Sequence, residues 1–170
     1  LPDNVPSDFY KQSQTATSSN EELAALILHE PNNRGTATAI YFYLWRHKER
    51  ILNHSDLYDP VLIIVPSDHV ISDEVVYFST MRKVCHLALE FKNIYLLGIV
   101  PTYASTQYGY IQVNNTTSSV LKVEAFIEKP SFEQACKLVK KNFVLWNSGI
   151  FVARRSVLFR AFSENWEHSD

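Results

Sequence analysis

The run Val61-Leu62-Ile63-Ile64-Val65 constrains the fold of this chain more than any other feature. It is continuously apolar and rich in β-branched residues, which is typical of a strand covered on both faces in a parallel α/β sheet. A buried helix would also accommodate these residues, but Pro66 would end that helix within two turns, so we favour the strand. Ser67, Asp68 and His69 follow it directly. Ligands of open α/β sheets bind beyond the carboxyl ends of strands, so we expect chemistry here first.

The first hundred residues show apolar segments that alternate between strand and helix patterns. Such an alternation predicts right-handed crossovers and a parallel sheet. Thr36 is expected to cap the first helix, and Ser72 or Asp73 the second. The expected elements are a strand at 23–28, a helix at about 37–52, the strand at 61–65, a helix ending near 91 and a strand at 94–99.

The pattern changes after Pro101. Two segments with more alternation, 108–113 and 120–127, flank a polar turn, which predicts a hairpin or a pair of antiparallel neighbours. Ser131 is expected to cap a helix that ends near Lys141. A strand at 150–153 and a helix at about 156–166 complete the pattern. Residues 1–20 are polar and aperiodic, which predicts a flexible arm before one domain at 21–170.

Composition excludes some classes of function. The 16 basic and 18 acidic residues give a net charge of −2, which argues against a nucleic-acid binder with a broad basic face. No run approaches the ~20 apolar residues of a membrane span. No secretory signal is visible at the start, and Cys85 and Cys136 are expected to be free thiols, so we expect a cytoplasmic protein.

Several loops that follow strands carry polar residues, and each has an ordinary structural alternative. Asp68 could bind a divalent cation or could belong to the cap of the next helix. Glu30 and Arg34 could form a site or a solvated turn. Glu128 and Lys129 could bind a ligand or form an exposed ion pair of little energetic weight. The segment 146–149 could offer the Asn147 amide to sugar hydroxyls or could be a polar turn anchored by a buried tryptophan.

The chain carries six motifs in this order: Glu30-Pro31-x-x-Arg34-x-Thr36-Ala37-x-Ala39-Ile40, Pro66-Ser67-Asp68-His69-Val70-Ile71, Gly98-Ile99-x-Pro101-Thr102, Tyr108-Gly109-Tyr110-Ile111, Phe126-Ile127-Glu128-Lys129-Pro130 and Trp146-Asn147-Ser148-Gly149-Ile150-Phe151. Taken in order, they resemble the mannose-1-phosphate guanylyltransferases, which belong to the sugar-phosphate nucleotidylyltransferases. The resemblance covers residues 30 to 151, and it is specific in combination although each motif alone is weak.

The resemblance implies a Rossmann-like α/β/α sandwich with a mostly parallel sheet and a small antiparallel hairpin. It also implies transfer of a nucleotidyl group from GTP to a sugar 1-phosphate, with Mg²⁺ and release of pyrophosphate. By their place in the motifs, Asp68 would bind the metal and Lys129 would face the sugar phosphate, so both would be catalytic. The residues that would bind substrate are Glu30, Arg34 and Thr36 near the nucleotide and Gly109, Glu128 and Asn147 near the sugar.

The chain also departs from the family. The glycine-rich loop that grips the triphosphate has no counterpart, since the first glycine is Gly35, and no later aspartate segment follows the Asn147 motif before Asp170. We therefore expect an incomplete domain, a fragment or one part of a split enzyme, that is inactive alone. The alternatives are a non-catalytic module that binds sugar phosphate and pairs with a full-length relative, or a domain whose motifs are relics. An uncovered sheet surface near 61–65 would favour a homo-oligomer or a complementing chain.

Overall fold

The computed structural model describes residues 34–48, 59–114 and 118–166 of the chain. The chain divides into two compact units. One comprises residues 60–158 and contains the sheet. The other combines residues 1–59 with 159–170, and its described elements are α2 (Thr36–Arg46) and most of α6 (Arg155–Trp166). The predicted arm and the predicted strand at 23–28 lie outside the described residues.

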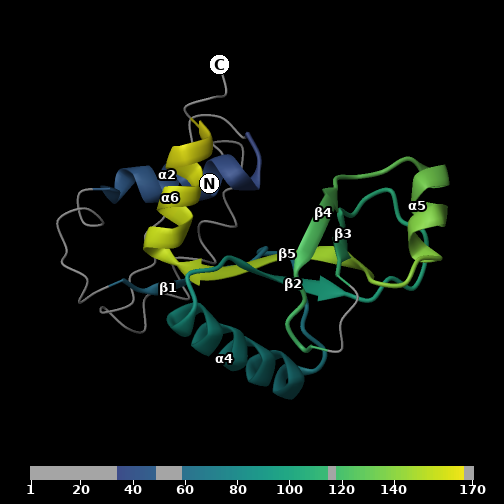
Figure 1. The fold of residues 1–170 in the computed structure, drawn as a ribbon, viewed down its shortest axis with the longest axis horizontal. Helices are drawn as coiled ribbons and strands as arrows, with labels where there is room; N and C mark the ends of the chain where they lie inside the picture. Colours follow the sequence, from purple (N-terminus) through teal and green to yellow (C-terminus); the bar gives the residue numbers. More distant parts are fainter. Residues whose placement is uncertain (1–33, 49–58, 115–117, 167–170) are drawn as a thin grey trace, which may run out of the picture. The chain divides into compact units, whose positions relative to one another are not determined.

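The sheet of the larger unit has five strands, and α4 (Glu74–Glu90) and α5 (Phe132–Val139) pack beside it. Figure 1 shows α4 along β1 and β2, with α5 at the other end of the sheet beside β3 and β4. This mixed α/β architecture agrees with the predicted class. No helix in the described ranges is long and apolar enough to cross a bilayer. The strands are β1 (Val61–Ile64), β2 (Tyr95–Ile99), β3 (Tyr110–Val113), β4 (Val123–Ile127) and β5 (Val144–Arg154).

The expected parallel pairing is wrong for the described strands. β1 and β2 do run in the same direction on either side of a common neighbour, but that neighbour is β5, which is antiparallel to both. The pairs β3–β5 and β3–β4 are antiparallel as well, the latter as predicted for the hairpin. A continuous apolar run indicates that both faces of a strand are covered, and it carries no information about the direction of the adjacent strands.

Helix starts follow the predicted capping residues in two of three cases. The Asp73 side chain accepts a hydrogen bond from the Val76 amide at 3.0 Å and so begins α4. Ser131 forms a reciprocal capping box with Gln134 at the start of α5. The prediction for Thr36 was wrong: Gly35 occupies the cap of α2 at φ 88°, and Thr36 is the first helical residue.

Two apolar clusters hold the sheet and its helices together. Met81 and Ala88 of α4 pack on Ile150 and Val152 of β5. The second cluster joins β3 and β5 to α5 and consists of Tyr110, Ala135, Leu138, Val144 and Trp146. Arg154, at the end of β5, donates hydrogen bonds to the carbonyls of Ala88 and Leu89 and thereby satisfies the last turn of α4.

Tyr110 fixes the loop that precedes β3. It is fully buried, and its hydroxyl donates to the Ser105 carbonyl and accepts from the Ser105 amide, each at 2.9 Å. Tyr110→Phe removes both partners from a buried backbone, so we expect the free energy of unfolding to fall by about 2 kcal/mol. Urea denaturation measures this, with Tyr43→Phe at an exposed position as the matched control. Equal effects of the two substitutions would contradict the role given to the buried hydroxyl.

Candidate sugar-phosphate site

One edge of β5 is shared by two strands that leave a gap between them. Val152 pairs with both β1 and β2, and Trp146 pairs with both β3 and β2. A strand residue has one neighbour on each edge, so β1 and β3 must follow one another along the edge opposite β2. β1 pairs up to Phe151 and β3 begins at Trp146. Residues 147–150 of β5 therefore have no paired strand on this edge. The loop after β1 and the loop before β3 can approach them there.

Two of these loops approach β5 in the gap. Pro66, just after β1, passes so close to Gly149 that a β carbon built there would lie 3.1 Å from its Cγ. Gly149 has φ 74°, a left-handed conformation that glycine adopts at no steric cost. Just before β3, the Gly109 carbonyl accepts a hydrogen bond from the Asn147 amide at 2.8 Å. The loop with the Asp68 motif and the loop with the Tyr108-Gly109 motif thus both meet the Asn147 motif along one stretch of β5.

Glu128 lies across Gly109. Tyr110 pairs with Ile127 in the β3–β4 register, which places the residues before and after them, Gly109 and Glu128, opposite each other. A β carbon built on Gly109 would be 3.0 Å from Glu128 Oε2 and 3.0 Å from the Phe126 ring. The missing side chain at 109 therefore leaves the space in which the carboxylate rests.

Asn147 is oriented by the backbone of its own strand. Its Oδ1 accepts a hydrogen bond from the Gly149 amide at 3.1 Å. The Nδ2 group has no partner among the described residues, so both of its hydrogens are available to a ligand. Because side chains alternate along a strand, Asn147 faces away from its neighbour Trp146, which is buried in the cluster with α5.

Lys129 continues from Glu128 in a strained conformation. Its φ is 39°, in the left-handed region that residues with a β carbon seldom adopt, and it lies between the exposed Glu128 and the buried Pro130. Its ammonium has no partner within the described part of the chain. Such strain in a non-glycine residue often marks a binding site, because the surrounding structure must hold it in place.

The remaining predicted residues have no described contact with Gly109, Glu128 or Asn147. Asp68 is exposed on the turn after β1, the same segment that passes Gly149. Arg34 and Thr36 are exposed near the start of α2 and belong to the other compact unit. Glu30 lies outside the described residues. Of the eight predicted residues, Gly109, Glu128 and Asn147 are thus brought together directly, and Lys129 is attached to them through the chain.

Several supporting residues were missed by sequence reasoning. Ser148 is held in the strand by its hydroxyl, which donates to the Leu97 carbonyl at 2.7 Å and accepts from the Ile150 amide at 3.2 Å, so segment 146–149 is strand and not the polar turn considered above. Tyr103 and Tyr108 both contact the Trp146 ring, with centroids 4.9 and 5.1 Å away. The side-chain hydrogen bond between Tyr103 and Tyr108 raises the pKa of Tyr103 above its ordinary value.

Among the described residues, a second titratable group with a shifted pKa lies on α4. Burial raises the pKa of the Cys85 thiol, so little thiolate forms near neutral pH. Cys85 and Cys136 are free, as predicted, and both are partly buried within helices. The structure gives neither of them a role in the site.

The predicted metal ligand, Asp68, does not belong to a cluster of metal-binding side chains among the described residues. Among the described residues, no group of three or more histidine, cysteine, aspartate or glutamate side chains is placed to hold a metal. Asp68 offers a single exposed carboxylate. Mg²⁺ is commonly bound by one or two carboxylates together with substrate phosphates, so a lone aspartate fits a cation that arrives with a nucleotide.

Two known proteins of similar sequence carry the same activity in their names. The mannose-1-phosphate guanylyltransferase RfbM of Salmonella typhimurium is 36% identical over 137 residues, which is 80% of this chain and 28% of that protein. A mannose-1-phosphate guanylyltransferase of Escherichia coli K12 is 33% identical over 138 residues, 78% of this chain and 28% of that protein. The chain therefore spans little more than a quarter of the length of these relatives.

Solved structures share the fold. A mannose-1-phosphate geranyltransferase from Thermus thermophilus superposes with a TM-score of 0.70 at 22% identity, over 98% of this chain and 49% of that one. A mannose-6-phosphate isomerase from Helicobacter pylori gives a TM-score of 0.65 at 28% identity, over 85% of this chain and 54% of that one. The family model for nucleotidyl transferases matches residues 5–168. The chain belongs to the nucleotidyl transferase family.

Proposed function

We propose that this chain supplies the sugar 1-phosphate side of a mannose-1-phosphate guanylyltransferase site. The observation that carries the proposal is that Gly109 lies against the Glu128 carboxylate and bonds the backbone of Asn147, whose side-chain Nδ2 has no partner among the described residues. A carboxylate acceptor and an amide donor on one face suit vicinal hydroxyls of a hexose. The names of the relatives supply the sugar and the nucleotide.

Lys129 is the proposed partner of the sugar phosphate, next in sequence to the carboxylate that holds the sugar. Transfer brings two polyanions together, so cationic groups must offset their repulsion. Asp68 would hold Mg²⁺, which when bound would neutralise charge on the nucleotide phosphates. Glu30, Arg34 and Thr36 are proposed to contact GTP. On this proposal, the chain's own residues position the substrates and neutralise the charge of their phosphates. They form no covalent bond with substrate.

We propose further that the chain is not sufficient for turnover by itself. No group of three or more histidine, cysteine, aspartate or glutamate side chains among the described residues is placed to hold the cation, and the sequence contains no glycine-rich loop to grip a triphosphate. The same observation favours the second candidate function, a non-catalytic module that binds sugar phosphate and pairs with a full-length relative. A pyrophosphate-release assay with GTP, Mg²⁺ and mannose 1-phosphate tests this on the isolated chain. Release of pyrophosphate would contradict both the insufficient chain and the non-catalytic module.

Isothermal titration of the full chain with mannose 1-phosphate tests the sugar site. Glu128→Gln keeps the size of the side chain and removes its charge, so we expect the affinity to fall at least about tenfold, since hydrogen bonds to charged groups contribute roughly 1.5–3 kcal/mol. Glu124→Gln, an exposed change of the same kind on β4, is the control and should leave the affinity unchanged. Absence of binding by the wild-type chain would refute the proposed function.

A further inference from the structure

Among the described residues, the outer edge of β2 is open. β2 pairs with β5 along one edge, and no other described strand pairs with it. Its sequence, Tyr95-Leu96-Leu97-Gly98-Ile99, contains no charge and no proline, the features that commonly protect an edge strand from added partners. Ile99 and the following Val100 are 51% and 72% exposed. The edge thus offers unpaired backbone groups flanked by uncovered apolar side chains.

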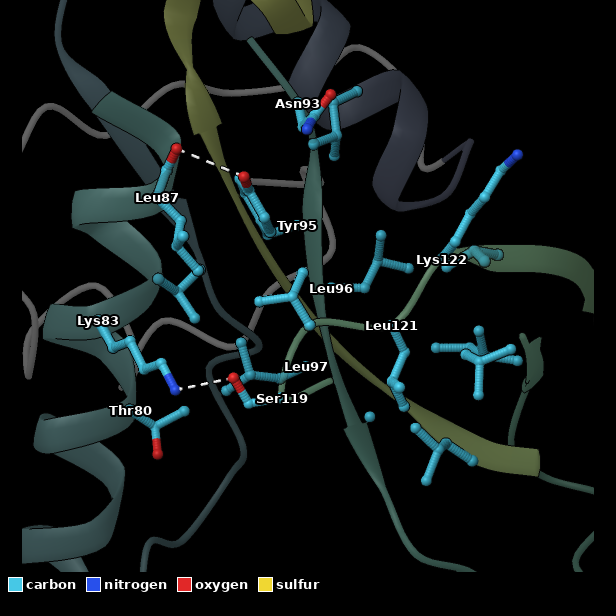
Figure 2. Close-up of a pocket in the computed structure, with 18 residues that line it drawn as sticks. Thr80, Lys83, Leu87, Asn93, Tyr95, Leu96, Leu97, Ser119, Leu121 and Lys122 are labelled. Atoms are coloured by element: carbon cyan, nitrogen blue, oxygen red, sulfur yellow. Dashed lines mark hydrogen bonds between the residues drawn. The ribbon is translucent and has the colours of Figure 1, made fainter. Parts of the chain in front are cut away.

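A cavity of about 910 Å³ runs along this edge and reaches around both faces of β2. Figure 2 shows α4 on one side, with Lys83 and Leu87, and Leu121 on the other, with Leu96 and Leu97 between them. Successive residues of β2 line the cavity. Because side chains alternate along a strand, they point to opposite walls of the cavity. A trough with a strand edge at its centre and apolar walls on both sides has the shape required by an added strand, whose side chains also alternate.

The charged residues that line the cavity favour a partner that carries a carboxylate. Lys83 and Lys122 are among its lining residues, and no aspartate or glutamate is. The Lys83 ammonium donates to the Ser119 hydroxyl at 3.0 Å, and this is its only partner in the described part of the chain. A carboxylate would pair more strongly with this cation than the neutral hydroxyl does. A second copy of the same edge fits poorly, because symmetric pairing would bring like lysines together and β2 itself carries no acid.

We propose that the open edge of β2 binds an extended segment of another polypeptide. The segment adds as a strand, places apolar side chains against both walls of the trough and sets a carboxylate on Lys83. This site uses none of the residues assigned to sugar phosphate, so it stands independently of the proposed function.

The test uses the full chain and a fluorescein-labelled hexapeptide of sequence Glu-Val-Thr-Val-Thr-Glu, with binding followed by fluorescence anisotropy. We expect saturable binding that weakens at least tenfold when alternate peptide amides are N-methylated, since methylation removes the backbone donors and keeps the side chains. Lys83→Glu should weaken binding by a similar factor, whereas Lys141→Glu, an exposed site outside the cavity, should not. Hydrogen exchange of the amides at 95–99 should slow when the peptide is bound.

The opposite results are equally clear. Absence of binding, or equal binding of the N-methylated peptide, would overturn the proposal. Decanoate is the probe for a small amphipathic anion. If decanoate binds, is weakened by Lys83→Glu and leaves the exchange of the β2 amides unchanged while the peptide fails to compete, the cavity is a small-molecule site and the strand proposal is wrong. Concentration-dependent dimerisation in light scattering that Lys83→Glu strengthens would assign the edge to a second copy instead.

Discussion

Lys129→Gly is expected to remove most of the affinity for mannose 1-phosphate without lowering the stability of the chain. The left-handed backbone at φ 39° costs a residue with a β carbon roughly 1–2 kcal/mol, and glycine is free of that cost. Glycine also raises the entropy of the unfolded chain, which offsets about 0.5–1 kcal/mol of the gain. The free energy of unfolding should therefore stay equal or rise by up to about 1 kcal/mol.

The loss of binding has a separate cause. A charge-assisted contact with a phosphate contributes roughly 1.5–3 kcal/mol, so removing the ammonium should weaken binding about ten- to hundredfold. Lys129→Ala removes the same charge and keeps the strain, so it should match the glycine variant in titration calorimetry and resemble the wild type in urea denaturation. Lys141→Ala controls for the loss of an exposed lysine.

Two outcomes would contradict this account of Lys129. If Lys129→Gly destabilises the chain by more than about 1 kcal/mol, the observed φ does not represent stored strain. If both variants bind mannose 1-phosphate normally, Lys129 does not meet the phosphate. Neutral mannose, which has no phosphate, should bind wild type and variants equally.

Gly149→Ala is expected to produce the largest loss of stability among single changes near the site. At φ 74° an added β carbon is strained by roughly 1–2 kcal/mol, and it would also lie 3.1 Å from Pro66 Cγ, which adds an overpacking cost on the order of 1 kcal/mol. We expect the free energy of unfolding to fall by about 2–3 kcal/mol in urea denaturation.

Matched variants separate the two causes at Gly149. Gly149→Asn should cost less backbone strain, because asparagine tolerates the left-handed region better than alanine. Pro66→Ala combined with Gly149→Ala should relieve the steric contact and leave the backbone cost. If Gly149→Ala is as stable as the wild type, β5 does not hold this conformation between β1 and β3, and the proposed gap is wrong.

Local signals in the sequence anticipated much of the fold. Asp73 and Ser131 cap their helices as predicted, because a capping side chain bonds an amide only three residues away. The strands at 61–64 and 95–99 were also predicted, since each is marked by its own apolar run. Thr36 was predicted to cap α2, but Gly35 occupies that position. The residue that takes a cap position depends on how the chain enters the helix.

Long-range pairing was not predictable in the same way. The length of β5 was missed because Asn147, Ser148 and Gly149 have turn chemistry, and they stay in the strand only through partners such as the Leu97 carbonyl and Pro66. The antiparallel insertion of β5 between β1 and β2 was missed because an apolar run is the same beside a parallel or an antiparallel neighbour. The order of the motifs indicated the family, while only the register between β3 and β4 placed Glu128 over Gly109.

The sequence by itself determined where helices begin, which segments are apolar strands and which motifs carry polar groups. These properties depend on residues within a few positions of each other. Tertiary structure alone decided that Gly109, Glu128 and Asn147 share one face, and that no described strand pairs with the outer edge of β2 near Lys83. Both results arise from backbone hydrogen bonds between strands distant in sequence, whose register is set by the packing of whole faces and not by any local signal.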